Sequence, residues 1–173
     1  MDPIQAALLG FIQGVTEWLP ISSTGHLRIT EMLLGLTLPL LFDITLHVGT
    51  LAIILFFFRK DVKNMFAALA KGNFKSENGK LIPLIIVGTV PTAIIGVVFS
   101  NTIEAVFSGF LPIAGAFLTC GVVLYISKTG QDKKENITYL AALAIGTAQG
   151  IALVPGISRS GFTIATALLL VKG

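Results

Sequence analysis

The sequence predicts an all-α protein that crosses a membrane several times, and three observations support this prediction. Of the 173 residues, 54% are hydrophobic and only 12% are charged, whereas about a quarter of the residues in a soluble domain are charged. The apolar residues gather in long runs rather than in amphipathic stripes. A polar motif near the start of the chain also reappears near its end, which is typical of membrane proteins built from repeats.

Three stretches are long enough, or nearly so, to cross a hydrocarbon core, which takes about 17–25 apolar residues. They cover roughly 42–58, 81–100 and 109–126. Prolines occur in the second and third stretches, and neighbouring helices can satisfy the carbonyls that a proline frees. We therefore expect three transmembrane helices in this part of the chain.

The basic residues predict the sidedness of these spans. Nine of the twelve Lys and Arg residues fall in two segments, 59–80 and 127–137, which we expect to be short loops. Two spans separate these loops, so both lie on one face, and the positive-inside rule makes that face cytoplasmic. The net charge of +3 is thus explained by topology, and we expect no nucleic-acid partner.

Residues 1–41 do not form a simple span. The apolar run from Ile4 is interrupted by Glu17 and ends at Pro20, and the run over 27–41 contains Arg28 and Glu31, which we expect to face water or each other. Each run is too short and too polar to cross a bilayer facing lipid. A re-entrant helix–loop–helix hairpin suits them, because irregular backbone at membrane depth must be buried in protein or line a cavity.

An internal repeat appears when the chain is aligned with itself at an offset of 136 residues. The segment GFIQGVTEWLPISSTG (10–25) then matches GTAQGIALVPGISRSG (146–161) without gaps. Because the first copy holds a hairpin and three spans, the second copy enters the membrane upside down, as in inverted-repeat proteins with a site at the midplane. We divide the chain into a first repeat, 1–137, and the start of a second, 138–173. A complete pair of repeats would need roughly another hundred residues.

The second copy of the motif favours anion binding. In PGISRSGFT (155–163), Ser158 and Ser160 offer hydroxyls, Arg159 offers a rigid fork of donors, and Gly161 begins a helix whose free N–H groups face the loop. Such a set is suited to phosphate. An arginine at membrane depth costs at least ~2.5 kcal/mol, which favours a functional role over helix capping alone.

The first copy adds groups for proton transfer and nucleophilic attack. Ser22, Ser23 and Thr24 bring hydroxyls, and His26 brings a titratable ring. One turn apart on the preceding helix, Gln13 and Glu17 share a face. Together they could hold a divalent cation, Mg²⁺ or Ca²⁺, through water; alternatively Glu17 orients His26 or pairs with Arg159.

These motifs resemble a known family. Gln13-x-x-x-Glu17, PISSTGH (20–26) and PGISRSG (155–161) together resemble the undecaprenyl-diphosphate phosphatases, also called bacitracin-resistance proteins, and the likeness extends through FDITLHVGT (42–50). Members are membrane enzymes with inverted repeats that remove the terminal phosphate from a C55 isoprenyl diphosphate and so recycle the lipid carrier of cell-wall synthesis. The family's catalytic residues correspond here to Glu17, Ser23, His26, Ser158, Arg159 and Thr163.

The resemblance implies a multi-pass enzyme of the cytoplasmic membrane whose partner is an isoprenyl diphosphate lipid, and it leaves room for a homodimer. We expect Arg159, Ser158, Ser160, Gly161 and Thr163 to bind the diphosphate together with Ser22 and Thr24. Ser23, His26 or a water activated by His26 would attack the outer phosphorus. A transporter or flippase for a phosphorylated lipid or anion would have the same inverted-repeat plan, and a scaffold without catalysis is the third hypothesis. Family members continue well beyond the position equivalent to Gly173.

Overall fold

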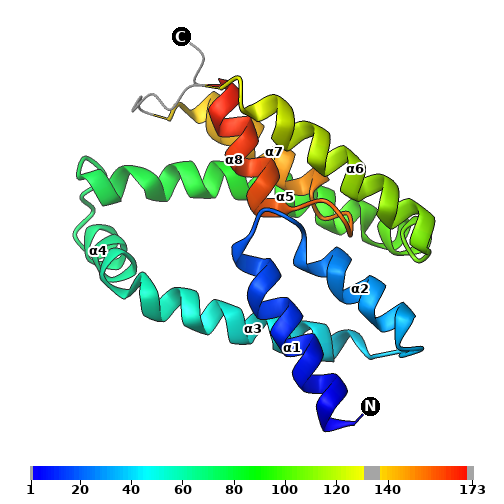
Figure 1. Cartoon of the computed structure of the whole chain (residues 1–173). Helices are drawn as coiled ribbons and strands as arrows, with labels where there is room; N and C mark the ends of the chain where they lie inside the picture. The colour runs from blue at the N-terminus through cyan, green and yellow to red at the C-terminus, as the bar shows by residue number, and fades with distance from the viewer. Residues whose placement is uncertain (1, 131–136, 171–173) are drawn as a thin grey trace.

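The computed structural model describes residues 2–130 and 137–170, and this part of the chain is all helical (Figure 1). It confirms the all-α part of the predicted fold class, whereas the inverted repeat and the re-entrant course of the hairpins remain predictions. Eight helices are formed within these residues: α1 (Pro3–Trp18), α2 (Ser23–Leu33), α3 (Leu40–Phe57), α4 (Arg59–Ala70), α5 (Glu77–Val106), α6 (Phe110–Ser127), α7 (Tyr139–Ile151) and α8 (Arg159–Leu170).

The long apolar helices agree with the predicted spans. In the part of the chain that the structure describes, α5 and α6 are each long and apolar enough to cross a membrane, and they contain the stretches 81–100 and 109–126. The stretch 42–58 corresponds to α3, an apolar helix of 18 residues from which α4 is bent by 78°, and this bent pair holds one further candidate span. The described residues therefore contain two helices that could span a membrane, or three candidates when the bent pair is counted as one.

The prediction of a loop over 59–80 is wrong for most of that segment. Helix α4 occupies Arg59–Ala70, and α5 already begins at Glu77. The basic residues drew attention to charge, but apolar residues recur between them at helical spacing, at Val62, Met65, Phe66 and Leu69. The second predicted loop, 127–137, contains residues 131–136, which lie outside the described residues.

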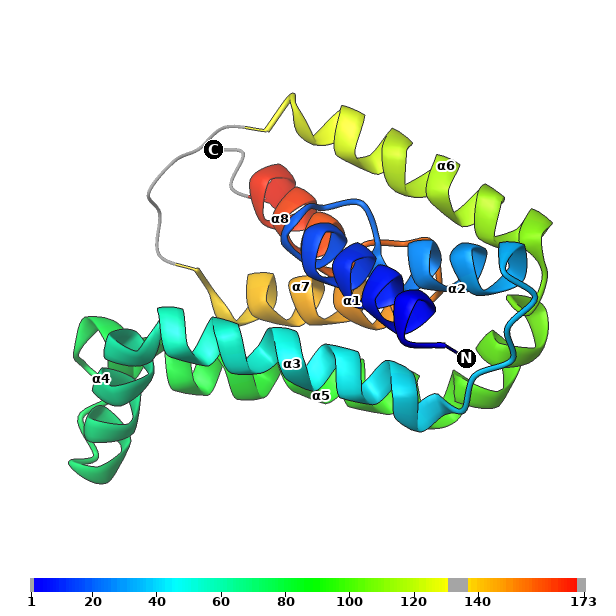
Figure 2. The same cartoon turned by 60° about the horizontal axis from the view of Figure 1, so that its bottom comes forward.

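Two hairpins point their turns at each other in the middle of the molecule (Figures 1 and 2). One is α1–α2, the other is α7–α8, and each is a helix–loop–helix made of helices too short to span a bilayer alone, as predicted for residues 1–41. The two turns use the same local device. Ser22 Oγ accepts from the N–H of Gly25 at 3.3 Å, and Ser158 Oγ accepts from the N–H of Gly161 at 3.1 Å.

These two serine–glycine pairs are related by the offset of 136, so the repeat in the sequence corresponds to a repeated turn in the fold. The opposite membrane orientation of the two copies, and the boundary between 137 and 138, remain predictions. Contacts cross that boundary, since α5 packs along α7 more extensively than any other described pair of helices.

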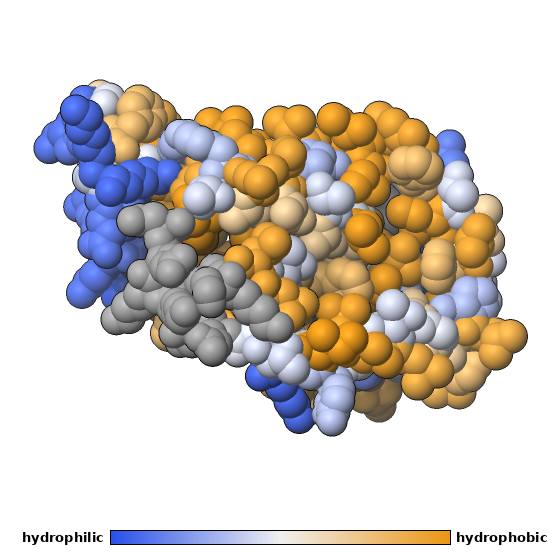
Figure 3. Space-filling view, turned by 90° about the horizontal axis from the view of Figure 1, so that it is seen from above, coloured by the Kyte–Doolittle hydropathy of each residue, from blue (hydrophilic) through white to orange (hydrophobic). Residues whose placement is uncertain are grey.

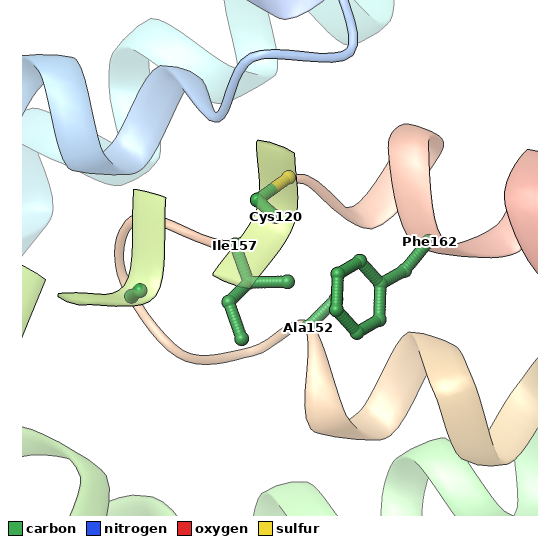
Figure 4. Packing of buried hydrophobic residues seen from close by; sticks show 5 residues of the cluster. Cys120, Ala152, Ile157 and Phe162 are labelled. Atoms are coloured by element: carbon green, nitrogen blue, oxygen red, sulfur yellow. The ribbon is translucent and has the colours of Figure 1, made fainter. Parts of the chain in front are cut away.

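The second turn is held by a small apolar core (Figure 4). Cys120 and Ala116 of α6 pack there against Ala152, Ile157 and Phe162. The Sγ atom of Cys120 also accepts a hydrogen bond from the N–H of Ser158 at 3.4 Å. Much of the visible exterior is apolar (Figure 3). Exposed apolar side chains include Val97 of α5 and Leu111 of α6. Lipid rather than water suits such a surface.

Helices α5 and α7 cross at two glycines. A Cβ added to Gly146 would clash with the backbone of Gly88. The same crossing is held by a hydrogen bond, because Thr92 Oγ1 donates to the carbonyl of Gly146 at 2.8 Å. Small residues are what allow membrane helices to approach this closely. The repeat-related Gly10 has no such neighbour, because an added Cβ there would meet only Leu46 Cδ2, at 3.9 Å.

We therefore expect Gly146→Val to destabilise the protein by about 3 kcal/mol, the upper end of overpacking costs, because the obstructing atoms belong to backbone. Gly10→Val, the matched control, should cost far less. Thermal unfolding of the two variants in one detergent measures the difference. Equal midpoints for both variants would contradict the close crossing of α5 and α7.

Candidate active site

A cavity of about 220 Å³ lies where the two turns meet. Its walls come from the end of α1, the first turn of α2, the loop after α7 and the first turn of α8. The lining residues are Thr16, Glu17, Leu19, Ser22, Ser23, Thr24, Ala152, Leu153, Val154, Ile157, Ser158, Arg159 and Ser160. Residues from the two ends of the sequence thus share one cavity.

Seven of the residues predicted for the site line this cavity: Glu17, Ser22, Ser23, Thr24, Ser158, Arg159 and Ser160. Four others do not line it: Gln13, His26, Gly161 and Thr163. Each of these four lies within one turn of a lining residue in sequence, so they support the walls rather than form them.

Ser22 joins the two hairpins. Its backbone has φ 67°, which is rare for a residue with a side chain, and this conformation belongs to the N-cap of α2. Besides the N–H of Gly25, its Oγ accepts from the N–H of Gly156 at 3.1 Å. Because Ser22 is only 5% exposed, losing this acceptor would leave the N–H of Gly156 buried without a partner.

Gly25 and Gly156 allow the two turns to touch. A Cβ on Gly25 would lie 2.8 Å from the Cα of Gly156, and a Cβ on Gly156 would lie 2.7 Å from the carbonyl oxygen of Ile113. Gly156 also has φ 99°, a conformation that favours glycine. Close backbone approach thus explains one glycine in each motif.

A chain of hydrogen bonds runs from Ser23 into α1. The hydroxyl of Ser23 donates to Glu17 Oε2, and Gln13 Nε2 donates to the same oxygen at 3.2 Å. Ser23 and Gln13 are almost fully buried. The carboxylate of Glu17 is therefore positioned to accept the hydroxyl proton of Ser23, which is the arrangement of a nucleophile with its general base.

His26 lies behind the first turn of α2 rather than in the cavity wall. Its Nδ1 lies 2.8 Å from the carbonyl oxygen of Ser22, to which it can donate, and its ring packs edge-on against Phe117 with centroids 5.0 Å apart. The carboxylate of Glu17 is hydrogen-bonded to Ser23 rather than to His26. The alternative in which Glu17 orients His26 is therefore not formed. In this conformation His26 steadies the turn.

Arg159, the first residue of α8, lines the cavity and is exposed. Within the described ranges its guanidinium forms no salt bridge, so the Glu17–Arg159 pair expected as an alternative is not formed. Ser158 Oγ and Ser160 Oγ lie 3.1 Å apart beside it. Thr163 bonds back to the carbonyls of Arg159 and Ser160, at 2.9 and 3.0 Å, and so holds the first turn of α8.

The cavity is electrostatically suited to an anion. The first residues of α2 and α8, Ser23 and Arg159, both line it, so the positive ends of two helix dipoles converge on one space. The guanidinium adds a full positive charge and a fork that matches two phosphate oxygens. Glu17 supplies the opposing negative charge at the other wall.

The described residues offer only a sparse donor set for a metal ion. Among them no group of three or more His, Cys, Asp or Glu side chains comes together. One observation nevertheless fits the predicted cation. Gln13 Oε1 is buried and has no hydrogen-bond partner in the part of the chain that the structure describes, and it lies on the residue that already bonds to Glu17.

Sequence reasoning missed two parts of this region. Thr16 and Leu153 line the cavity; the position of Thr16 beside Glu17 was the available signal. Arg28 was expected to face Glu31 or water, and it bonds to Glu31 Oε2 at 3.4 Å but also lies 3.8 Å from Asp43 Oδ2. This second pairing joins α2 to α3, and spacing alone gives no sign of it.

Comparison with known proteins agrees with the motifs. The family model described as bacitracin resistance protein BacA matches residues 6–171. The chain is similar to proteins named undecaprenyl-diphosphatase from Methanosphaera stadtmanae (41% identical) and Desulfosudis oleivorans (42% identical), in each case over 98% of this chain and 68% of the relative. A third, from Carboxydothermus hydrogenoformans, is 41% identical over 98% of this chain and 63% of its own length. The chain thus spans about two thirds of these relatives.

Proposed function

The chain belongs to the family of bacitracin resistance protein BacA, and from this premise we propose that it is a membrane-embedded phosphatase. Its substrate would be undecaprenyl diphosphate, converted to the monophosphate and inorganic phosphate in the cytoplasmic membrane. The observation that carries the proposal is the convergence of Ser23, Glu17 and Arg159 on one cavity at the starts of two helices. The relatives' names describe an enzyme, which favours hydrolysis over the transporter hypothesis.

Binding of the headgroup uses the second turn. The guanidinium of Arg159 binds two oxygens of the outer phosphate, and the hydroxyls of Ser158 and Ser160 donate hydrogen bonds to it. The positive end of the α8 dipole adds to this attraction. These donors also stabilise the charge on the equatorial oxygens in the transition state. Both turns come from one chain, so the proposal needs no second copy.

The proposed reaction has two steps. Ser23 Oγ attacks the outer phosphorus as Glu17 takes its proton, and the bond to the bridging oxygen breaks, so that isoprenyl monophosphate leaves. Glu17 gives this proton to the departing monophosphate oxygen and is a carboxylate again. It then deprotonates a water that attacks the phosphoserine, and the water's proton passes to Ser23 Oγ as inorganic phosphate is released and free Ser23 is restored. The Ser23–Glu17 hydrogen bond supports this order, and the position of His26 against Phe117 supports a positioning role for the ring.

A divalent cation, Mg²⁺ or Ca²⁺, forms part of the proposal. Glu17 and Gln13 Oε1 would hold it, with substrate oxygens and water completing its shell, because these hard cations prefer oxygen ligands. When bound, it would neutralise charge on the diphosphate. The orphaned Gln13 Oε1 is the feature that supports this assignment.

We expect Arg159→Ala to lower the rate of phosphate release from an isoprenyl diphosphate by at least about 10²-fold. The variant lacks the preorganised positive charge that stabilises the transition state. Arg159→Lys should recover part of the rate, since lysine keeps the charge without the fork. Phosphate release by the detergent-solubilised chain measures this, with Arg59→Ala as the control arginine outside the cavity. Full turnover by Arg159→Ala would exclude the clamp, and no release by the wild-type chain would favour transport.

Rapid quenching during turnover should trap phosphate on Ser23, and the adduct should survive acid but not alkali, as expected for a serine phosphate ester. Peptide mass spectrometry locates it, and Ser23→Ala should abolish both the adduct and turnover. An acid-labile adduct would identify His26 as the nucleophile. Turnover by Ser23→Ala without any adduct would indicate direct attack by water.

A further inference from the structure

Helix α4 has two chemically different faces. Val62, Met65, Phe66 and Leu69 recur at i, i+3, i+4 and i+7 and form one apolar stripe, whereas Lys60 and Asn64 lie on the opposite side. The stripe is only partly covered by protein, since Phe66 is 68% exposed and Leu69 is 49% exposed. The apolar side chains of Phe66 and Leu69 are thus exposed on a basic helix, where an apolar ligand can cover them.

An apolar groove of about 240 Å³ runs between α4 and the start of α5. It is lined by Val62, Met65, Phe66, Leu69 and Ile82, with no polar residue among them. A groove of this kind would be costly in water, and its shape and lining suit a hydrocarbon chain.

The bend before α4 bears on where this groove lies relative to a bilayer. Helix α3 is the candidate span before it, and α4 is bent from α3 by 78°. If α3 crosses the membrane, α4 therefore runs nearly in the membrane plane, as amphipathic interfacial helices do. Arg59 fixes the bend, because its Nη1 donates to the carbonyl of Phe56 at 2.9 Å and its guanidinium lies 4.8 Å from the centre of the Phe56 ring.

The charge around the groove is strongly positive. Six basic residues lie in 59–80 against only two acidic residues, Asp61 and Glu77. Lys63 follows Arg59 by one turn and precedes Phe66 by another, so cations flank the apolar stripe along the helix. In Figure 3 hydrophilic residues gather at the end of the molecule where α4 lies in Figure 1.

We propose that α4 and the start of α5 form a binding site for an acidic glycerophospholipid of the cytoplasmic leaflet, apart from the diphosphate cavity. One acyl chain lies in the groove against Phe66 and Leu69, and the headgroup phosphate is held by Lys63, which borders the apolar stripe. Charge selects this occupant over a neutral lipid, because anionic headgroups attract basic segments at this surface. The site does not depend on the proposed enzymatic activity.

Native mass spectrometry and thermal unfolding of the full chain in neutral detergent test the proposal. The probes are phosphatidylglycerol and phosphatidylcholine with identical acyl chains. Wild-type protein should bind phosphatidylglycerol at least tenfold more tightly, with a corresponding rise in the unfolding midpoint. Lys63→Gln should lower that preference roughly fivefold, the contribution of one lysine at this surface. Lys60→Gln, on the face opposite the groove, is the control and should lower it less; both side chains are exposed, so folding should be unaffected.

Phe66→Ser, with Asn64→Ser as its control on the opposite face, tests the groove. Phe66→Ser should weaken the binding of both lipids, and Asn64→Ser should change the binding of neither. Equal affinity of the wild type for the two lipids would overturn the proposal, as would a Lys63→Gln variant that keeps the full preference. A dimer that dissociates on Phe66→Ser, with no lipid preference, would assign the face to a second copy of the chain instead.

Discussion

One buried hydrogen bond, from the N–H of Gly156 to Ser22 Oγ, connects two turns that are 134 residues apart in the sequence. Losing such a partner costs about 1–3 kcal/mol in a protein interior. The contact is possible only because Gly25 and Gly156 have no side chains to separate the two backbones. Everything proposed for the cavity follows from it, since it brings the starts of α2 and α8 to one place.

The surroundings give this small polar centre its strength. The turns are held from behind by apolar groups, with Phe117 against His26 and the Cys120 cluster against the second turn. These apolar groups lower the local dielectric, so the guanidinium and two helix dipoles act on an anion more strongly than they would at a fully hydrated surface. The same apolar exterior that keeps the chain in a membrane thus also makes an otherwise modest set of donors effective.

Much of this could be predicted from the sequence, because periodicity and repetition are local signals. The hairpins, the helices over 81–100 and 109–126, and the meeting of Glu17, Ser23 and Arg159 in one cavity follow from apolar runs and from the offset of 136. The rest depends on packing that no spacing encodes. Whether His26 faces the cavity or Phe117 depends on α6, and the pairing of Arg28 with Asp43 depends on how α3 lies against α2. Helix α4 was missed because its lysines obscured an apolar stripe of four residues.

The most direct test of the central claim is a cross-link across the cavity in native membranes. Thr24→Cys combined with Ser160→Cys places one thiol on each wall, while the buried Cys120 and both single variants serve as controls. A short bifunctional thiol reagent should join residues 24 and 160 within one chain, as shown by the mass of the linked peptides. Failure to form that link, although each thiol reacts singly, would mean that the two turns do not share a cavity.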